Sequence, residues 1–563
     1  MENNLEDGLL LLKSCLDSPQ SRNEPLSYQG NASKPRPTTT FADHLVREHR
    51  LWNRSEVLRS DYPDGNCETG RGPRHGAVEI RFSNCLGRYL VASRDIAAGE
   101  VVLQEEPLLI VPKAGSEPTC LACLKVLASD WNGCEECGGP VCSQDCGGPH
   151  HASQECNLIR RMGFKHSSHR ESHIKELNII LGPLRALLLI QESPPAKELF
   201  FALQSHEEKR KKMQIGSVVM EHIVKVLHTR LGLEVESELV HRVCGVLDTN
   251  SFDVPLDNDQ RGRAIFIVSS MMNHSCVPNV QRWYFNGDLI VRASVDIAKG
   301  APILINYTQC LWGTRAREAH LIGCKMFICK CQRCLDPTEL GSHMSSIPCP
   351  ECQVLMVPPA GCQRSWTCLS CGKSTDPMAI ESMVGAGAVA LRRLPRDDPS
   401  AIKTVLSHLS RLLGQGHFIV CQIKYALIQA IMSLPLQEVD STDLIKVLEL
   451  TRELLKLASI VEPGLTRFRG LLLLEQIRAS YELLERAQGA DVAADVAADV
   501  EADVGDVKES VEVNRFESNA PFSRFTHKVK YRPEVSGSIP GGGGNKRAKC
   551  FFNPDAPVHL AAV

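Results

Sequence analysis

Residues 273–279 read NHSCVPN and directly follow the apolar run IFIVSSMM. The stretch places two asparagines, a histidine, a serine and a cysteine at the predicted edge of a hydrophobic core. Polar groups at such an edge need hydrogen-bond partners, and the Cys276 thiol can ligate a metal ion. We interpret the stretch as part of a binding site. The alternative is a capped polar turn in which Cys276 is an ordinary buried thiol.

The other cysteines are grouped in a way that indicates zinc. Of the 24 cysteines in 563 residues, seven fall within 120–156 and nine within 324–371. Many belong to C-x2-C or C-x-C pairs, whose neighbouring thiols suit tetrahedral Zn²⁺ better than a disulfide. The acidic N-terminal stretch is not expected to be a secretion signal, so a reducing compartment and metal binding are favoured.

Three cysteine groups are candidate zinc sites. The first has seven thiols and two neighbouring histidines, enough for two sites in a segment too short to fold without metal: Cys120, Cys123, Cys134, Cys137, Cys142, Cys146, Cys156, with His150 and His151. The second lacks a fourth ligand, which Cys276 is predicted to supply: Cys329, Cys331 and Cys334. The third has zinc-ribbon spacing: Cys349, Cys352, Cys368 and Cys371. We therefore expect three zinc ions and a fourth in the ribbon.

Composition excludes other classes of protein. The net charge is −3 and 43% of the residues are hydrophobic, so no general attraction to nucleic acid or membrane is expected. No apolar run approaches the ~20 residues of a membrane span.

Asn286-Gly287 between two β-rich runs predicts a hairpin.

These features resemble the SMYD family, whose SET methyltransferase domain is split by a MYND zinc finger. The order of motifs matches: GRYL at 87–90, the first cysteine block, NSF at 250–252, NHSCVPN, GAPILINY at 300–307 and FICKCQRC at 327–334. The stretch KMFICKCQRCLDPTELGSHMSS is similar to the arthropod SmydA branch in particular. The resemblance is strong over 77–376 and weak over 377–487.

The resemblance implies an α+β fold, with a SET β-fold and a knot-like active site. The predicted parts are a disordered N-terminal region (1–70), the first SET half (71–113), a MYND finger (114–156), a helical insert (157–262), the second SET half with a post-SET zinc site (263–335), a zinc-ribbon-like segment (336–376), a helical, solenoid- or TPR-like module (377–487), and a low-complexity linker and tail (488–563). Its ADVAADVAADV repeat supports a linker.

The resemblance also implies site residues. S-adenosylmethionine is the expected cofactor, and the expected substrate is a lysine-containing protein. The predicted catalytic residue is Tyr307, and the predicted cofactor contacts are Leu86, Gly87, Arg88, Asn250, Asn273, His274, Tyr307 and Phe327. The first MYND zinc would take Cys120, Cys123, Cys142 and Cys146, and the second Cys134, Cys137, Cys156 and a histidine, preferably His151. Related fingers bind proline-rich peptides, and related proteins occur in nucleus and cytoplasm.

Two positions depart from active relatives. Lys325 replaces an aromatic hydroxyl two residues before Phe327, and Tyr89 replaces a small residue in the GRYL turn. A lysine there would repel an incoming substrate cation or extend outward to solvent. We therefore keep two hypotheses: a protein-lysine methyltransferase acting on histone or other proteins, and a weak or silent SET/MYND scaffold that recruits partners, for example in transcriptional repression.

Overall fold

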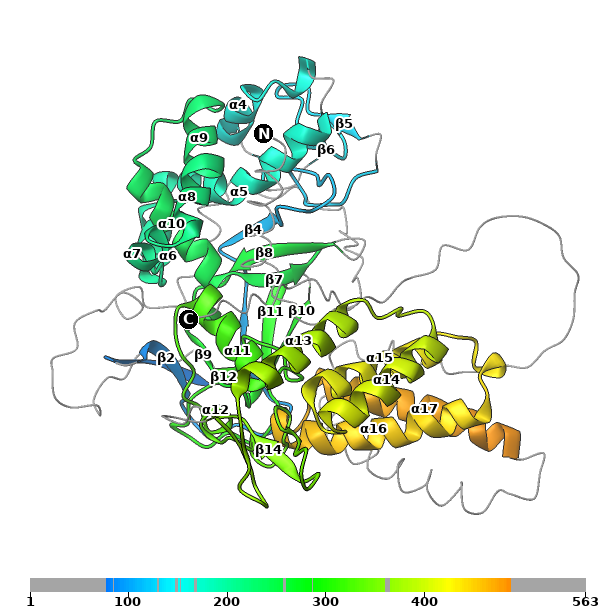
Figure 1. Cartoon of the computed structure of the whole chain (residues 1–563). Helices are drawn as coiled ribbons and strands as arrows, with labels where there is room; N and C mark the ends of the chain where they lie inside the picture. Colours follow the sequence, from blue (N-terminus) through cyan, green and yellow to red (C-terminus); the bar gives the residue numbers. More distant parts are fainter. Residues whose placement is uncertain are drawn as a thin grey trace, which may run out of the picture. The chain divides into compact units, whose positions relative to one another are not determined.

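The computed structural model describes residues 77–487 except 85, 129–130, 147–149, 152, 167–169, 257–259, 286 and 360–364. The predicted disordered N-terminal region (1–70) and the predicted low-complexity linker and tail (488–563) lie outside the described residues. The described chain divides into two compact units (Figure 1). Among the described residues, the first unit runs to Gly341 and includes Val461–Gly464, and the second comprises Ser342–Ile460 and residues 465–487. Among the described helices, none combines the length and apolar character needed to cross a bilayer.

The first unit contains several small sheets. The antiparallel pair is β1 (Val78–Ser83) with β2 (Gly87–Ala92). One three-stranded sheet has the order β10 (Val280–Phe285), β11 (Asp288–Ala293), β3 (Val101–Glu105), and the other β4 (Leu109–Pro112), β8 (Arg261–Ile265), β7 (Phe252–Pro255). Two short pairs are β5 (Asn132–Gly133) with β6 (Pro140–Val141), and β9 (Asn273–His274) with β12 (Leu304–Ile305). Short strands of this kind match the α+β prediction.

The hairpin between β10 and β11 follows from local sequence. Phe285 pairs with Asp288, so the connection has two residues, as expected for Asn-Gly. Gly287 has φ +93°, a backbone conformation that glycine adopts without a Cβ clash. Asn286 lies outside the described residues.

A series of helices lies in the chain between a first group of strands, β1–β6, and a second group, β7–β12. It consists of α4 (Ser153–Arg160), η2 (Phe164–His166), α5 (Arg170–Glu192), α6 (Pro194–Ala202), α7 (Glu207–Lys211), α8 (Gln214–Val219), η3 (Met220–Val224), α9 (Lys225–Thr229) and α10 (Ser237–Asn250). At the start of α6, the Ser193 hydroxyl accepts a hydrogen bond from the amide of Ala196, and proline occupies the first turn. Strand β7 begins at Phe252, inside the range that the sequence assigned to the helical insert.

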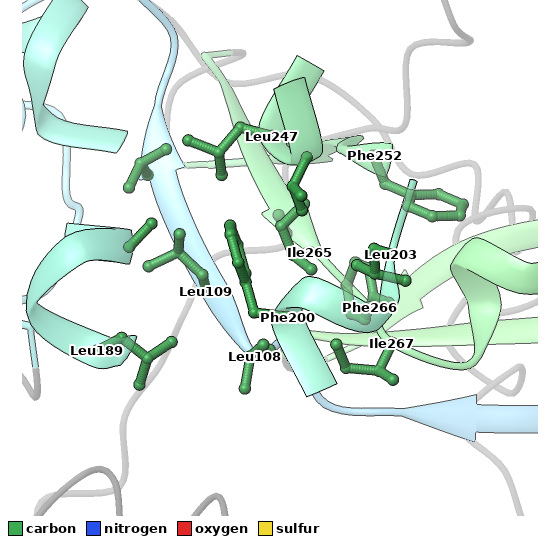
Figure 2. Packing of buried hydrophobic residues seen from close by; sticks show 14 of the residues in the cluster. Leu108, Leu109, Leu189, Phe200, Leu203, Leu247, Phe252, Ile265, Phe266 and Ile267 are labelled. Carbon is green, nitrogen blue, oxygen red and sulfur yellow. The ribbon is translucent and has the colours of Figure 1, made fainter. Parts of the chain in front are cut away.

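These helices pack on the sheet formed by β4, β8 and β7. Figure 2 shows Phe200 of α6 between Leu109 of β4 and Ile265 of β8, with Leu247 of α10 beside them. Phe200 is fully buried, and burying such a side chain stabilises the fold by about 1.5–3 kcal/mol. The same cluster includes Phe266 and Ile267, which directly precede the loop that leads to NHSCVPN. The core therefore holds the base of the predicted site.

Short helices complete the first unit: η4 (Ser269–Met271), α11 (Thr314–His320), the π-helical turn η5 (Leu321–Lys325) and α12 (Gln332–Leu335). Met326, which ends η5, has φ +60°. This left-handed residue turns the chain sharply between Lys325 and Phe327, so the two side chains leave the backbone from different structural elements.

The second unit combines a small sheet with helices. The sheet has the order β13 (Ile347–Pro348), β14 (Leu355–Val357), β15 (Trp366–Cys368), β16 (Ser374–Thr375). The helices are α13 (Pro377–Arg392), α14 (Pro399–Leu413), α15 (Phe418–Met432), η6 (Leu436–Glu438), α16 (Ser441–Val461) and α17 (Arg467–Ala487). Asp376 and Asp398 cap α13 and α14, each followed by proline in the first turn. Helix α15 is buried on most of its surface, packs on α13, α14 and α17, and forms the centre of this unit.

Candidate active site and its metal centres

The stretch NHSCVPN forms strand β9 and the turn that follows it. Strand β9 pairs in parallel with β12, with Asn273 opposite Leu304 and His274 opposite Ile305. Asn279 fastens the far end of the turn: its Oδ1 accepts from the amide of Leu304 at 2.8 Å, and its Nδ2 donates to the carbonyl of Pro302 at 2.9 Å. Asn279, the second asparagine of the motif, thus holds the turn in place. Asn273, the first asparagine, is part of strand β9.

Three aromatic rings meet beside this strand. The His274 and Tyr307 ring centroids are 5.2 Å apart, and those of His274 and Phe327 are 6.0 Å apart. The amide of Tyr307 donates to Nδ1 of His274 at 3.0 Å. The Tyr307 hydroxyl donates to the carbonyl of Met272 at 2.5 Å. Residues 273, 274, 307 and 327, which the sequence assigned to one site, are therefore neighbours in space.

His274 also connects this cluster to a metal centre. Burial lowers the pKa of His274 to about 4, so its imidazole is neutral near pH 7. Because Nδ1 accepts from the Tyr307 amide, the proton of the neutral ring belongs on Nε2. Nε2 lies 3.3 Å from Sγ of Cys276 and can donate to that sulfur. The tautomer of His274 is thus set from both sides.

A buried carboxylate positions the segment that enters β9. Glu105, at the end of β3, accepts hydrogen bonds from the amides of Val268 and Ser269, both at 2.8 Å, and from the Ser269 hydroxyl at 2.6 Å. Burial raises the pKa of Glu105 above its usual range, although the three hydrogen bonds act to lower this pKa. Sequence reasoning missed Glu105, because its hydrogen-bond partners are more than 160 residues away along the chain.

The predicted cofactor contacts of the first SET half lie at the start of β2, with Leu86 directly before the strand. Gly87 has φ +67°, and a Cβ added there would have no neighbour within 4 Å, so its surroundings are open. Leu86 is exposed, and burial lowers the pKa of the half-buried Arg88. Strand β2 reaches the second group of strands through Leu90, whose carbonyl accepts from the amide of Ile303 at 2.9 Å. It also packs on η4, directly before Asn273.

Asn250 closes α10. Its Nδ2 donates to the carbonyl of Gln204 at 2.8 Å and to that of Val246 at 2.7 Å. Both amide hydrogens are therefore engaged by the backbone, which leaves the side-chain oxygen of Asn250 for any cofactor contact.

Lys325 points into the site. Its Nζ donates to the carbonyl of Thr249 at 2.6 Å and lies 5.5 Å from the centroid of the Tyr307 ring. The amine thus lies between Tyr307 and the end of α10. Of the two orientations that the sequence left open, extension to solvent is not the one observed. Burial lowers the pKa of Lys325 to about 8.

The Cys276 thiol meets the C-x-C-x2-C cysteines. The ligand atoms of Cys276, Cys329, Cys331 and Cys334 lie within 4.8 Å of one another, and the Sγ atoms of Cys276 and Cys334 are 3.4 Å apart. A tetrahedral ion with Zn–S bonds of 2.3 Å places its sulfurs about 3.8 Å apart. Four thiols at this spacing fit zinc.

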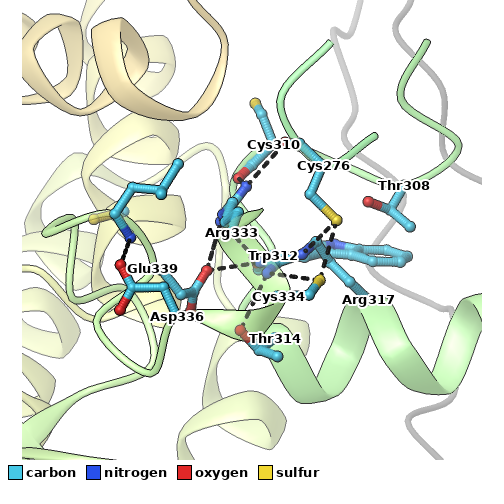
Figure 3. Close-up of polar contacts among 12 residues, drawn as sticks. Cys276, Thr308, Cys310, Trp312, Thr314, Arg317, Arg333, Cys334, Asp336 and Glu339 are labelled. Atoms are coloured by element: carbon cyan, nitrogen blue, oxygen red, sulfur yellow. Dashed lines mark hydrogen bonds and ion pairs between the residues drawn. The ribbon is translucent and has the colours of Figure 1, made fainter. Parts of the chain in front are cut away.

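Two arginines and a glutamate surround this centre. Arg317, Arg333 and Glu339 have no exposed side-chain surface. Figure 3 shows Arg317 between Cys276, Cys334 and Glu339: its Nε donates to Sγ of Cys276 at 3.2 Å, and its NH1 donates to Glu339 at 2.8 Å. Arg333 donates to the same carboxylate oxygen at 2.9 Å. The two cations offset the negative charge of a four-thiolate zinc site, with Glu339 fixing their orientation.

The first cysteine block forms two clusters. One contains Cys120, Cys123, Cys142 and Cys146, and the other Cys134, Cys137, His151 and Cys156. Sulfur–sulfur distances of 3.9, 3.7 and 3.9 Å agree with tetrahedral zinc. Of the two histidines, His151 contributes its Nε2, which lies 3.6 Å from the Cys137 sulfur.

The other ring nitrogen of His151 begins a chain of buried contacts. Its Nδ1 lies 3.0 Å from Glu155, and Glu155 accepts two hydrogen bonds from Arg185 of α5, at 2.6 and 3.0 Å. Arg185 also donates to the carbonyl of Leu121 at 2.6 Å. A carboxylate behind a metal-ligating histidine fixes its tautomer and orientation. The sequence analysis missed Glu155 and Arg185; the signal available for Glu155 was its place four residues after His151.

The fourth cluster lies in the sheet of the second unit and contains Cys349, Cys352, Cys368 and Cys371. The Cys349–Cys371 and Cys352–Cys368 sulfurs are 3.8 and 3.5 Å apart. Cys324 belongs to none of the four clusters found among the described residues, and Cys362 lies outside those residues. The four donor sets, three of four thiols and one of three thiols and an imidazole, can each bind zinc.

Comparison with known proteins gives the family. Residues 87–308 match the SET domain family model. The Drosophila melanogaster SET domain-containing protein SmydA-8 is 32% identical in isoform A, over 52% of this chain and 64% of that protein. Isoform B is 30% identical, over 53% of this chain and 67% of that protein. The chain thus spans about two thirds of the length of these relatives.

More distant matches include a plant methyltransferase and a solved SET domain. The Arabidopsis thaliana histone-lysine N-methyltransferase ASHR2 is 24% identical over 44% of this chain and 69% of its own length. A crystal structure of the SET domain of LSMT bound to lysine and AdoHcy is 13% identical over 81% of this chain and 95% of that one, with a TM-score of 0.24, too low for comparing the two sites. The motifs, the SET match and the SmydA-8 similarity together show that this chain belongs to the SMYD family of SET-domain proteins, in its SmydA-like branch.

Proposed function

We propose that this protein is an S-adenosylmethionine-dependent protein-lysine N-methyltransferase. The observation that carries the proposal is the contact between the Tyr307 amide and His274 beside a buried Tyr307 hydroxyl. The name of the plant relative, a histone-lysine N-methyltransferase, supports the same reaction class. A histone or another protein with an accessible lysine is the substrate class we infer.

The residues present suit the cofactor. S-adenosylmethionine would supply an electrophilic methyl group on its sulfonium. Gly87, with its open surroundings, allows the backbone to approach the amino-acid part. Asn273 offers a polar side chain beside the strand, and the Phe327 ring near His274 offers a face for the adenine.

Tyr307 would orient the acceptor amine. Burial raises the pKa of Tyr307 above its usual range, so the phenol keeps its proton at neutral pH. A protonated hydroxyl in a water-poor site can hold an amine in line with the methyl group, and such positioning lowers the barrier. The carbonyl oxygens of Met272 and Thr249 lie nearby and can accept hydrogen bonds. An acceptor amine that loses its water in this site would therefore still have hydrogen-bond partners.

We further infer that residues 114–156 form a MYND finger and residues 377–487 a TPR-like module. The two four-ligand clusters in the first and the successive packed helices in the second support these assignments. Binding of proline-rich peptides by the finger stays a prediction. The comparisons do not favour the silent-scaffold hypothesis.

The test combines binding and transfer. We expect calorimetric titration to detect S-adenosylmethionine binding, and methyl-tritiated cofactor to label core histones or another lysine-bearing protein. Tyr307→Phe should lower the transfer rate by about 10² while cofactor affinity stays within about twofold. Tyr284→Phe is the matched control, because Tyr284 is a buried tyrosine of β10 whose hydroxyl has no hydrogen-bond partner among the described residues. Absence of cofactor binding, or equal losses in both variants, would contradict the proposal.

A further inference from the structure

Lys325 places its side-chain amine beside Tyr307, the residue proposed to orient the acceptor amine. Its Nζ lies over the face of Tyr307, 5.5 Å from the ring centroid, and donates to the Thr249 carbonyl at 2.6 Å. Asn250 and Phe327 are predicted cofactor contacts. Thr249 directly precedes Asn250, and Lys325 lies two residues before Phe327. The amine is thus bordered by Tyr307 and by two of the segments that would hold the methyl donor.

The surroundings also favour the reactive form of the amine. Only the neutral form of lysine has a lone pair, and burial lowers the pKa of Lys325 to about 8, well below the usual value for lysine. The cations Arg263 and Arg282 act in the same direction. Among the described residues, Asp248 and Cys324 oppose this effect, and His206 and His320 also interact with the amine.

We propose that Lys325 is an internal methyl acceptor, modified by the active site of its own chain. The Nζ lone pair forms a nitrogen–carbon bond to the donor methyl while the carbon–sulfur bond breaks. The sulfur keeps the bonding electrons and leaves as the neutral thioether S-adenosylhomocysteine, and the new methylammonium releases its extra proton to solvent. This inference rests on the proposed methyltransferase function, because it uses the same donor and the same Tyr307.

The position of Lys325 makes the reaction intramolecular. The amine faces inward, between Tyr307 and Thr249, so the active site of a second chain would have no access to it. The reaction should therefore be first order, with a rate constant that does not depend on protein concentration.

The test uses the full chain, produced in bacteria and loaded with zinc, together with trideuteromethyl S-adenosylmethionine. Cleavage after glutamate releases residues 319–339, which carry Lys325 and the exposed Lys330 in one peptide. We expect tandem mass spectrometry to place the heavy methyl on Lys325, with Lys330 unmodified. The initial rate should rise about tenfold from pH 7 to pH 9, as the neutral fraction of an amine with a pKa of about 8 increases.

Controls separate this inference from the proposed function. Lys325→Arg should abolish heavy methyl in the peptide, and Lys299→Arg, at an exposed turn, should leave it unchanged. When the wild type is mixed with ¹⁵N-labelled Tyr307→Phe protein, the heavy methyl should appear only on the unlabelled chain.

The outcomes are distinct. Transfer to histones with an unmodified Lys325 would overturn this inference and leave the proposed function standing, as would label on Lys330 at the same rate. Label on the ¹⁵N chain would overturn the intramolecular reaction. Failure to bind the cofactor, or to transfer methyl to any acceptor, would overturn both proposals.

Discussion

Nδ1 of His151 lies 3.0 Å from a carboxylate oxygen of Glu155, and Nε2 of the same ring faces the sulfur of Cys137. The imidazole therefore joins a metal cluster on one side and a buried carboxylate on the other. The adjacent His150 is not part of a cluster. This difference between neighbouring histidines can be measured.

The first prediction concerns zinc content. His151→Ala should lower the zinc bound per chain from four ions to three, because the second cluster of the 120–156 segment loses a ligand. Elemental analysis of the purified protein measures the ratio. His150→Ala is the matched control and should keep all four ions; a loss of zinc in that variant alone would show that the ligand assignment is wrong.

The second prediction concerns the carboxylate behind the metal. Glu155→Gln keeps the size of the side chain but removes the charge that faces His151 and Arg185. We expect zinc affinity at this cluster to fall by about 10- to 100-fold, measured by competition with a chromogenic chelator. Glu192→Gln, at an exposed position of α5, should not change the affinity. Equal affinities for wild type and Glu155→Gln would exclude the role given to Glu155.

The third prediction concerns the arginines beside Cys276. Arg317→Met should destabilise the first unit by about 3–5 kcal/mol, since it removes one partner from a fully buried charge network. Thermal unfolding of the zinc-loaded protein, followed by tryptophan fluorescence, gives the change. Arg315→Met, on the exposed side of the same helix, should change stability by less than about 0.5 kcal/mol. A similar unfolding temperature in both variants would argue against the network.

The fourth prediction concerns acceptors other than Lys325. Below pH 8 the Lys325 amine is mostly charged, and a charged amine repels an incoming substrate lysine. Lys325→Met should therefore raise transfer to external lysines at pH 7 by about tenfold, since removing about 1.4 kcal/mol of repulsion corresponds to that factor. The gain should shrink by pH 9, where the wild-type amine is neutral. If the gain in transfer is the same at pH 7 and pH 9, the size of the Lys325 side chain and not its charge hinders the substrate.

Some of this organisation is readable from the chain itself. C-x2-C and C-x-C pairs bring their own thiols together, because residues so close in sequence share one turn; the structure gathers every predicted ligand into four clusters. The family motifs likewise name Asn273, His274 and Tyr307, which the structure brings together. The Asn286-Gly287 turn between two β-rich runs predicted the β10–β11 hairpin.

Other features depend on folding. Arg185 reaches Glu155 across 30 residues, and Lys325 reaches Thr249 across 76. Nothing in the local sequence indicates that Lys325 points inward, because a lysine stem can extend to solvent from almost any surface position. Sequence spacing sets which ligands can converge within one turn. Only the packed core decides which distant charges are buried together, because desolvation makes each buried charge depend on partners that the fold supplies.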